Sequence, residues 1–151
     1  MSDVFSTKKR SEVMSRIRGR GNVTTEMAMI AIFREAGIKG WRRHVEMRPR
    51  LAPEDRSRAA KRGRIRVRPD FIFRRARLAL FIDGCFWHGC PQHATKPRQN
   101  AEFWSLKLQA NVQRDAAHTR ALVLAGWRVL RIWEHELRQP VELRTRLEKL
   151  I

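Results

Sequence analysis

Apolar and polar positions alternate along the chain first with helical and then with strand-like spacing. In residues 26–36 the apolar positions recur every three or four residues, which predicts a helix capped by Thr24 or Thr25 and stopped by Gly37. A strand is expected at 41–45. The apolar runs 71–73 and 78–82 flank a short polar link, so they predict an antiparallel hairpin.

The second half of the chain repeats the helix and strand pattern. Residues 101–125 predict a long helix that ends at Gly126, residues 127–133 predict a strand, and Pro140 begins a last helix. The apolar cover of the long helix is expected from Phe103, Leu106, Leu108, Val112, Leu122 and Leu124. This order of elements predicts an α/β fold, a sheet with helices on both faces, within one domain of 151 residues.

The net charge of the chain restricts its possible partners more than the rest of its composition does. The chain carries 33 Lys and Arg against 15 Asp and Glu, a formal net charge of +18, which favours a polyanionic partner. It contains no apolar run long enough for a membrane span, and its first ten residues lack the apolar core of a signal peptide. Two cysteines cannot build a disulfide framework, so a reducing compartment and a metal-binding role are expected.

Two basic segments lie outside the predicted core. Residues 1–21 form an N-terminal arm with a short helix at 8–17, and the alternative is a disordered basic tail. Residues 22–151 form the domain, in which residues 48–66 are a basic insertion at the edge of the sheet. That insertion has few apolar residues, so it is expected either to become ordered against phosphates or to remain a solvated loop.

The predicted hairpin brings two carboxylates toward one end of the sheet. A turn near Arg75 places Asp70 opposite Ile82 and beside Asp83, within a residue or two. Mg²⁺ binds one or two carboxylates, waters and a substrate phosphate, so the pair predicts a divalent cation site. The alternative is that both aspartates are turn residues bonded to backbone. Glu26 lies in the first helical turn, where it also suits the helix dipole.

Cysteines and histidines gather after the second hairpin strand. The candidate zinc ligands are Cys85, Cys90, His93 and His135, because structural zinc takes four nitrogen or sulfur ligands. His88 is then free to act as a general acid or base, or to replace His135 as the fourth ligand. The alternative for the whole set is buried thiols and surface histidines.

Two adjacent aromatics, Phe86 and Trp87, precede this histidine. Exposed aromatics beside cations can stack on bases or wedge between them, whereas the alternative for this pair is ordinary core packing.

At these residues the sequence resembles the very-short-patch repair (Vsr) endonuclease family. The resemblance covers nearly the whole chain except residues 48–66, and its most specific stretch is FIDGCFWHGCPQH. The other matching stretches are SEVMSRIRGR, TTEM, RPDFIF, EFWSLKLQANVQRD and GWRVLRIWEHEL.

The resemblance implies a restriction-endonuclease-like fold and a specific activity. The expected reaction is Mg²⁺-dependent nicking of DNA at T:G mismatches left by deamination of 5-methylcytosine, with a structural zinc. The implied catalytic residues are Asp70, Asp83, His88 and Glu26. The implied metal ligands are Asp70 and the Ile82 carbonyl for Mg²⁺, and Cys85, Cys90, His93 and His135 for zinc. The implied aromatic wedge is Phe86, Trp87 and Trp104.

These observations lead to a single functional expectation. The chain is expected to be a monomeric, nucleoid-associated cytoplasmic endonuclease of bacteria that binds double-stranded DNA and no membrane. Met14, Arg16 and Arg18 of the arm are expected to contact that DNA. The alternatives are a related nuclease in a restriction or mobile-element context, and a zinc-stabilised DNA-binding protein without cleavage.

Overall fold

The computed structural model describes Lys8 and residues 23–55, 63–93 and 97–151. Four strands form one mixed sheet in the order β1 (Trp41–Arg43), β2 (Phe71–Phe73), β3 (Leu78–Asp83) and β4 (Arg128–Trp133). The first three are antiparallel neighbours, whereas β4 lies parallel to β3. The predicted hairpin is therefore confirmed. Its register is shifted by one residue, because Phe71 pairs with Leu80, which brings Asp70 level with Phe81.

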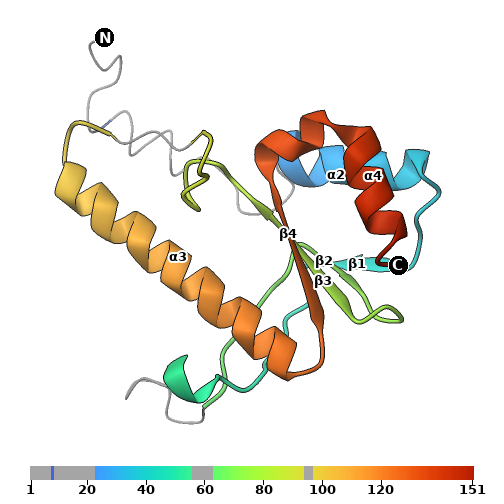
Figure 1. Ribbon diagram of the computed structural model, residues 1–151, viewed down its shortest axis with the longest axis horizontal. Helices are drawn as coiled ribbons and strands as arrows, with labels where there is room; N and C mark the ends of the chain where they lie inside the picture. Colours follow the sequence, from blue (N-terminus) through green and yellow to red (C-terminus); the bar gives the residue numbers. More distant parts are fainter. Residues whose placement is uncertain (1–7, 9–22, 56–62, 94–96) are drawn as a thin grey trace.

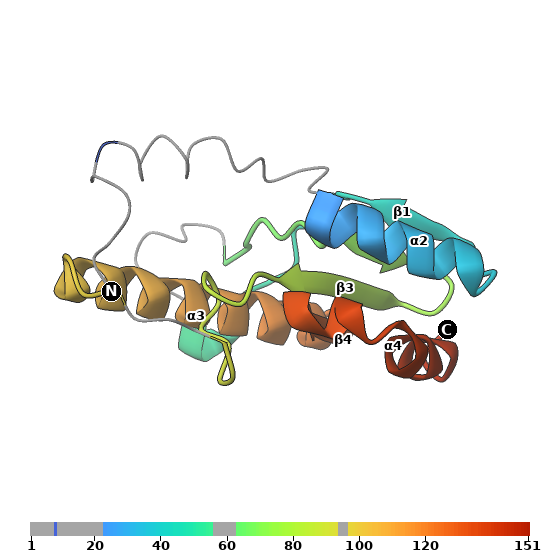
Figure 2. The ribbon, with the colours of Figure 1, turned by 90° about the horizontal axis from the view of Figure 1, so that it is seen from above.

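Helices cover both faces of this sheet, as predicted (Figures 1 and 2). The helical turn η1 (Val23–Met27), helix α2 (Ala28–Glu35) and helix α4 (Pro140–Glu148) lie on one face. Helix α3 (Ala101–Leu124) lies on the other. Two short 3-10 turns, η2 (Pro53–Asp55) and η3 (Glu134–Arg138), complete the described elements.

Each face of the sheet has its own apolar core. Phe33 of α2 packs against Phe71 and Phe73 with ring centroids 5.1 and 5.5 Å apart, and Leu143 and Leu147 of α4 join the same cluster. On the opposite face, Leu122 of α3 packs with Ile72, Ala79 and Phe81. Because neighbouring strand residues point to opposite faces, the short runs 71–73 and 78–82 serve both cores.

The first helix begins earlier than its sequence pattern indicated. A π-helical turn starts at Val23 and runs into α2, so Thr24 and Thr25 both lie inside the helical segment, and no side chain that the structure describes caps α2. The predicted stop is confirmed, because Gly37 adopts the left-handed conformation (φ +66°) that glycine accepts without strain.

The predicted apolar cover of α3 is largely wrong. Phe103 and Leu106 are 58% and 61% exposed, and Val112 and Leu124 are exposed as well. The physical reason is that most of the helix extends beyond the short sheet (Figure 1), so only its C-terminal turns, with Ala121 and Leu122, are buried.

The described ends of the basic insertion are more ordered than the sequence suggested. Leu51 and Ala52 are buried, as is Val67 directly after the insertion, and the Nε of Arg120 on α3 donates to the carboxylate of Asp55 at 2.7 Å. A few well-placed apolar residues therefore hold this segment against the domain. Its middle, residues 56–62, lies outside the described part of the chain, as does the arm except Lys8. Among the described helices, none has the length and apolarity needed to cross a membrane.

Candidate functional site

One group of possible metal ligands forms where three separate segments meet. Glu26 comes from η1, His44 follows β1 and Asp70 precedes β2, and their ligand atoms all lie within 4.8 Å of one another. Strand pairing explains why His44 and Asp70 lie close together. The antiparallel register of β1 and β2, extended by one residue, places His44 opposite Asp70. The backbone N–H of His44 donates to the Asp70 carbonyl at 3.2 Å, and the His44 Nε2 lies 2.9 Å from the Glu26 carboxylate.

The electrostatics of this group favour a bound cation. Burial raises the pKa of the Asp70 carboxyl to about 6; a hydrogen bond from the Ile82 N–H, at 2.7 Å, opposes the rise, and the Glu26 carboxylate adds to it. Glu26 is itself buried and is contacted by Arg43. The two carboxylates fit a hard divalent cation, whose positive charge would offset the cost of keeping Asp70 ionised.

A second group lies where β3 meets α3. Asp83, His88 and Asp115 bring their ligand atoms within 4.8 Å of one another. Arg131 on β4 donates to both oxygens of Asp83, at 2.7 and 2.9 Å. The His88 Nδ1 is hydrogen-bonded to Asp115, which leaves its Nε2 as the nitrogen available to another partner.

The carboxylate of Asp115 has an altered acidity. Burial alone would raise its pKa, but the hydrogen bond with His88 and the nearby Arg131 guanidinium outweigh burial and lower the pKa overall. Asp115 is therefore a charged partner that fixes the orientation of His88.

The two predicted aspartates do not share one group of ligands. Ile82 and Asp83 are consecutive residues of β3, and a strand directs consecutive side chains to opposite faces. The Ile82 N–H bonds to Asp70, whereas the Asp83 carboxylate is paired with Arg131. Asp83 is near enough for its charge to contribute to the raised pKa of Asp70, but its carboxylate groups with His88 and Asp115 and not with Asp70.

The four predicted zinc ligands do come together. Their ligand atoms lie within 4.8 Å of one another, and Cys90 is almost completely buried. Sulfur-to-Nδ1 distances are 3.3 Å from Cys85 to His135, 3.6 Å from Cys90 to His135 and 3.9 Å from Cys90 to His93. Tetrahedral zinc at usual bond lengths separates sulfur from nitrogen ligands by about 3.6 Å, so the donor set and its spacing fit zinc. His88 lies in the other group, not in this one.

The three predicted wedge aromatics form one cluster. Ring centroids lie 5.1 Å apart for Phe86 and Trp87, 5.5 Å for Phe86 and Trp104, and 5.9 Å for Trp87 and Trp104. All three side chains are half-buried and none belongs to either core of the described domain. The Asn111 side chain on α3 donates to the Trp87 carbonyl at 3.0 Å and ties the loop to the helix.

Sequence reasoning missed three residues of these groups. His44 could have been found by extending the pairing of the strand at 41–45 with the strand at 71–73, which brings it opposite Asp70. Asp115 lies inside the stretch EFWSLKLQANVQRD that carried the resemblance, and Arg131 lies within GWRVLRIWEHEL. The expected DNA contacts of Met14, Arg16 and Arg18 fall outside the described residues.

Comparisons with known proteins show the family to which the chain belongs. The sequence model of the family described as "DNA mismatch endonuclease Vsr" matches residues 55–94, which include Asp70, Asp83 and His88. The chain is 30% identical over 155 residues to the type II nicking enzyme V.XorIIP of Xanthomonas oryzae, an alignment that covers all of this chain and 98% of that relative.

Two further relatives match over part of their length. Identity is 53% over 72 residues with the type II nicking enzyme V.NaeI of Lentzea aerocolonigenes, covering 48% of this chain and 43% of the relative. It is 43% over 72 residues with the DNA mismatch endonuclease Vsr of Escherichia coli, covering 47% and 46% respectively. With the full-length match to a nicking enzyme and the family match over its central segment, this chain belongs to the Vsr family of DNA endonucleases.

Proposed function

We propose that this protein is a Mg²⁺-dependent endonuclease of the very-short-patch repair type, which nicks one DNA strand beside a T:G mismatch formed by deamination of 5-methylcytosine. Its mixed sheet would then be of the restriction-endonuclease type. The observation that carries the proposal is the group of Glu26, His44 and Asp70, whose ligand atoms lie within 4.8 Å at one end of the sheet.

This group can hold the cation and the scissile phosphate. Asp70 and Glu26 supply carboxylate oxygens, and the Ile82 carbonyl is the proposed backbone ligand beside them. The Arg43 side chain contacts Glu26 and remains 31% exposed, so its guanidinium group is the proposed donor to a phosphate oxygen. When bound, Mg²⁺ would polarise the phosphoryl oxygen and stabilise the oxygen that leaves.

We assign the proton transfer to His88. Its Nδ1 is occupied by Asp115, so Nε2 is the atom that can exchange a proton with the attacking water or the leaving oxygen. Asp83 lies 3.7 Å from the His88 Nδ1 and is neutralised by Arg131, which supports a positioning role for Asp83 instead of direct ligation.

The aromatic cluster is the proposed means of finding a mismatch. Separating stacked bases costs a few kcal/mol, and the cost is lowest where the pair is already weak. Phe86, Trp87 and Trp104 lie together and half-buried, and stacking on a base recovers roughly 1–3 kcal/mol for each exposed face. Cys85, Cys90, His93 and His135 would hold a structural zinc that anchors this loop.

The runner-up is a nicking enzyme of the same family that serves a restriction system. Relatives named type II nicking enzymes support this reading, and the E. coli relative named a mismatch endonuclease supports repair. Both readings share the nicking chemistry, and they differ in whether the substrate is a mismatch. The non-catalytic alternative loses its support, because the chain belongs to a family of endonucleases.

The test of the proposed substrate is a nicking assay on otherwise identical duplexes that contain T:G, other mismatches or a matched pair, with Mg²⁺ present. We expect T:G to be nicked fastest, on one strand only. Equal rates on matched and mismatched duplexes would contradict the mismatch assignment.

The role of the aromatic cluster is tested with Trp87→Ala. This variant should lose more affinity for the T:G duplex than for the matched duplex, with an unchanged salt slope for non-specific binding. Equal loss of both affinities, with a lowered melting temperature, would show that Trp87 is a core residue.

A further inference from the structure

Two chain segments at the ends of the basic insertion continue strands β1 and β2 outward from the sheet. We call residues 46–50 and 64–68 together the basic ribbon. Met47 and Val67 exchange backbone hydrogen bonds of 2.8 Å, and the Ile65 N–H donates to the Pro49 carbonyl at 3.0 Å. The bridges Met47–Val67 and Arg50–Arg64 continue the antiparallel register of β1 and β2, in which Trp41 lies opposite Phe73. The ribbon therefore continues the register of β1 and β2 beyond residues 44–46 and 68–70, which lie between those strands and the Met47–Val67 bridge.

The inner face of the ribbon is anchored in the domain. Val67 is fully buried in the core beneath α3, and Met47 and Ile65 pack against the same cluster. Pro49, opposite Ile65, is buried too. The apolar side chains thus occupy one face of the ribbon, which fixes the direction of the other face.

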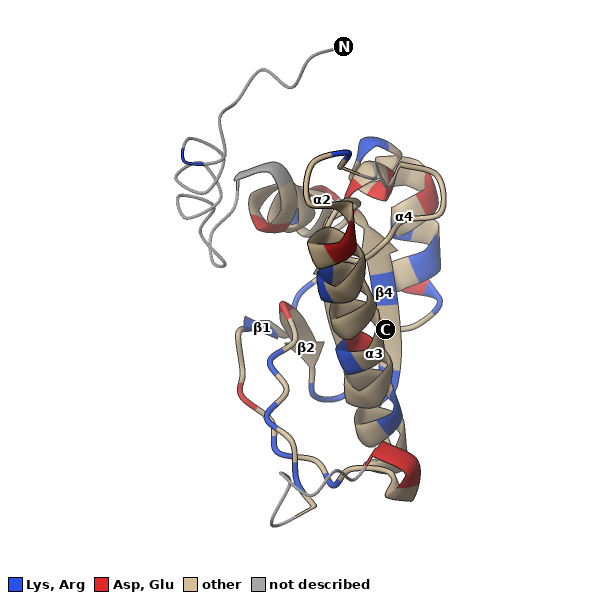
Figure 3. Ribbon diagram, turned by 90° about the vertical axis from the view of Figure 1, so that its left-hand side faces the viewer, with Lys and Arg blue, Asp and Glu red and all other residues tan. Residues whose placement is uncertain are grey.

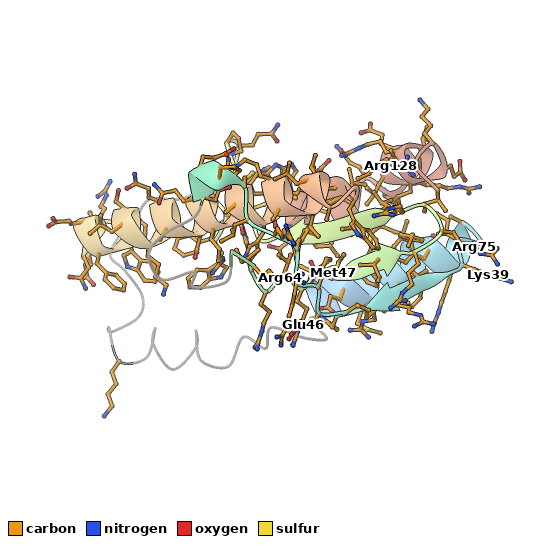
Figure 4. All side chains as sticks on the ribbon, turned by 90° about the horizontal axis from the view of Figure 1, so that it is seen from below. Lys39, Glu46, Met47, Arg64, Arg75 and Arg128 are labelled. Carbon is orange, nitrogen blue, oxygen red and sulfur yellow. The ribbon has the colours of Figure 1, made fainter. Side chains whose placement is uncertain are left out.

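The outer face carries almost only positive charge. In this register Glu46 lies opposite Arg68, Arg48 opposite Arg66, and Arg50 opposite Arg64. This face therefore holds five arginines and one glutamate, a net charge of +4. Figure 3 shows the repeated basic positions along both arms, and Figure 4 shows Glu46 and Arg64 on the side away from α3.

The arginines are held in a row while their ends stay accessible. The Glu46 carboxylate contacts Arg48 at 2.8 Å, Arg66 at 3.3 Å and Arg68 at 3.4 Å. The side chains of Arg48 and Arg66 nevertheless remain 64% and 67% exposed. Arg48, Arg64 and Arg66 line a common open hollow. One carboxylate cannot neutralise this many guanidinium groups, so the hollow is suited to a further anion.

The row begins at the candidate metal group. Arg68 lies two residues before Asp70, and Glu46 lies two residues after His44. Successive outward residues of a strand are about 6.8 Å apart, so the arginines follow one another away from the metal group at regular steps. A DNA strand whose scissile phosphate lies at Asp70 would present its neighbouring phosphates along the same direction.

We propose that the outer face of the basic ribbon binds the phosphates that flank the cleavage site on one side and so extends the DNA footprint. This inference rests on the proposed function, because it takes the Asp70 group as the position of the scissile phosphate. The net charge of +4 and the exposed guanidinium groups of Arg48 and Arg66 favour contact with phosphates. Reading of guanine edges by arginine is the alternative that the test separates.

The test compares two double variants that remove the same charge. Arg64→Gln with Arg66→Gln alters the ribbon. Lys39→Gln with Arg75→Gln is the control, since both residues are exposed at the end of the molecule away from the ribbon (Figure 4). Affinity for one long duplex is measured as a function of salt. The ribbon variant should bind on the order of tenfold more weakly, with a salt slope smaller by about 1.8, because each lost phosphate contact removes about 0.9. The control should change the slope much less.

Two additions keep the result decisive. Arg64→Lys with Arg66→Lys keeps both charges and should restore the slope, which separates charge from loss of folding. Equal losses of affinity and salt slope in the ribbon variant and in the control would overturn the proposal. A changed sequence preference with an unchanged salt slope would also overturn it, because it would indicate reading of base edges. Binding does not require turnover, so a wild-type protein that fails to nick would overturn the proposed function without deciding the ribbon.

Discussion

At the scale of single residues, chemistry is divided between the two faces of β3. Ile82 points its backbone N–H at Asp70, and the next residue, Asp83, belongs to the group with His88 and Asp115. A strand shifts the side-chain direction at every residue, so one strand end can serve a metal group on one face and a histidine on the other.

The orientation of His88 leads to the first residue-scale prediction. His88→Ala should lower nicking by about 10²–10⁴-fold, the usual contribution of a general acid or base, while duplex affinity changes little. Asp115→Asn removes the charge that orients the imidazole and should lower the maximal nicking rate more than affinity. Single-turnover rates and equilibrium affinities measured on the same duplex separate the two effects. A wild-type rate in His88→Ala would remove this residue from the mechanism.

At the scale of elements, the loop between β3 and α3 is connected to distant parts of the chain. His135 lies on η3 after β4, and it approaches Cys85 and Cys90 of the loop to within 3.3 and 3.6 Å. The same loop carries Phe86, Trp87 and His88, and Asn111 attaches it to α3. Whatever fixes Cys85 and Cys90 therefore also fixes the aromatic cluster and the histidine.

Zinc content tests this connection. Elemental analysis of the purified protein should find about one zinc for each chain, as four protein ligands hold one ion. His135→Ala should lose zinc and melt at a lower temperature, because the energy of ligation contributes to folding. His88→Ala is the matched control, since it also removes an imidazole from this region but should keep the zinc. Zinc lost from His88→Ala and retained in His135→Ala would place His88 among the ligands.

At the scale of the whole molecule, net charge and shape act together. Helix α3 extends beyond the short strands (Figure 1), and basic positions recur along the segments between β1 and β2 (Figure 3). A molecule with a net charge of +18 should bind non-specific DNA through phosphates and do so less well as salt rises. Selection of a site then depends on the smaller cluster of aromatic and metal-binding groups.

Local patterns made much of this fold predictable. The runs at 71–73 and 78–82, the stop at Gly37 and the proline at the start of α4 each carry a local signal that the structure bears out. The meeting of Cys85, Cys90 and His93 also follows from short spacing, and only His135 had to come from a distant element.

Contacts between distant elements were less predictable. Helical periodicity in α3 shows which side of the helix is apolar, but not how far the sheet extends beneath it, so Phe103 and Leu106 were wrongly placed in the core. The pairing of Asp83 with Arg131 depends on β4 lying parallel to β3, and no local pattern records that arrangement. The basic insertion was underestimated because three buried apolar residues are enough to order its described ends.

The most direct test of the central claim is the nicking rate of Asp70→Asn on a T:G duplex, measured together with its affinity for that duplex. The substitution removes a charged ligand with almost no change of shape. Nicking should therefore fall by about 10³-fold or more, while affinity holds or rises because a negative charge beside phosphate is lost. Glu142→Gln, an exposed carboxylate on α4, should nick at the wild-type rate. Full activity in Asp70→Asn would contradict the assignment of the Glu26, His44 and Asp70 group as the catalytic metal centre.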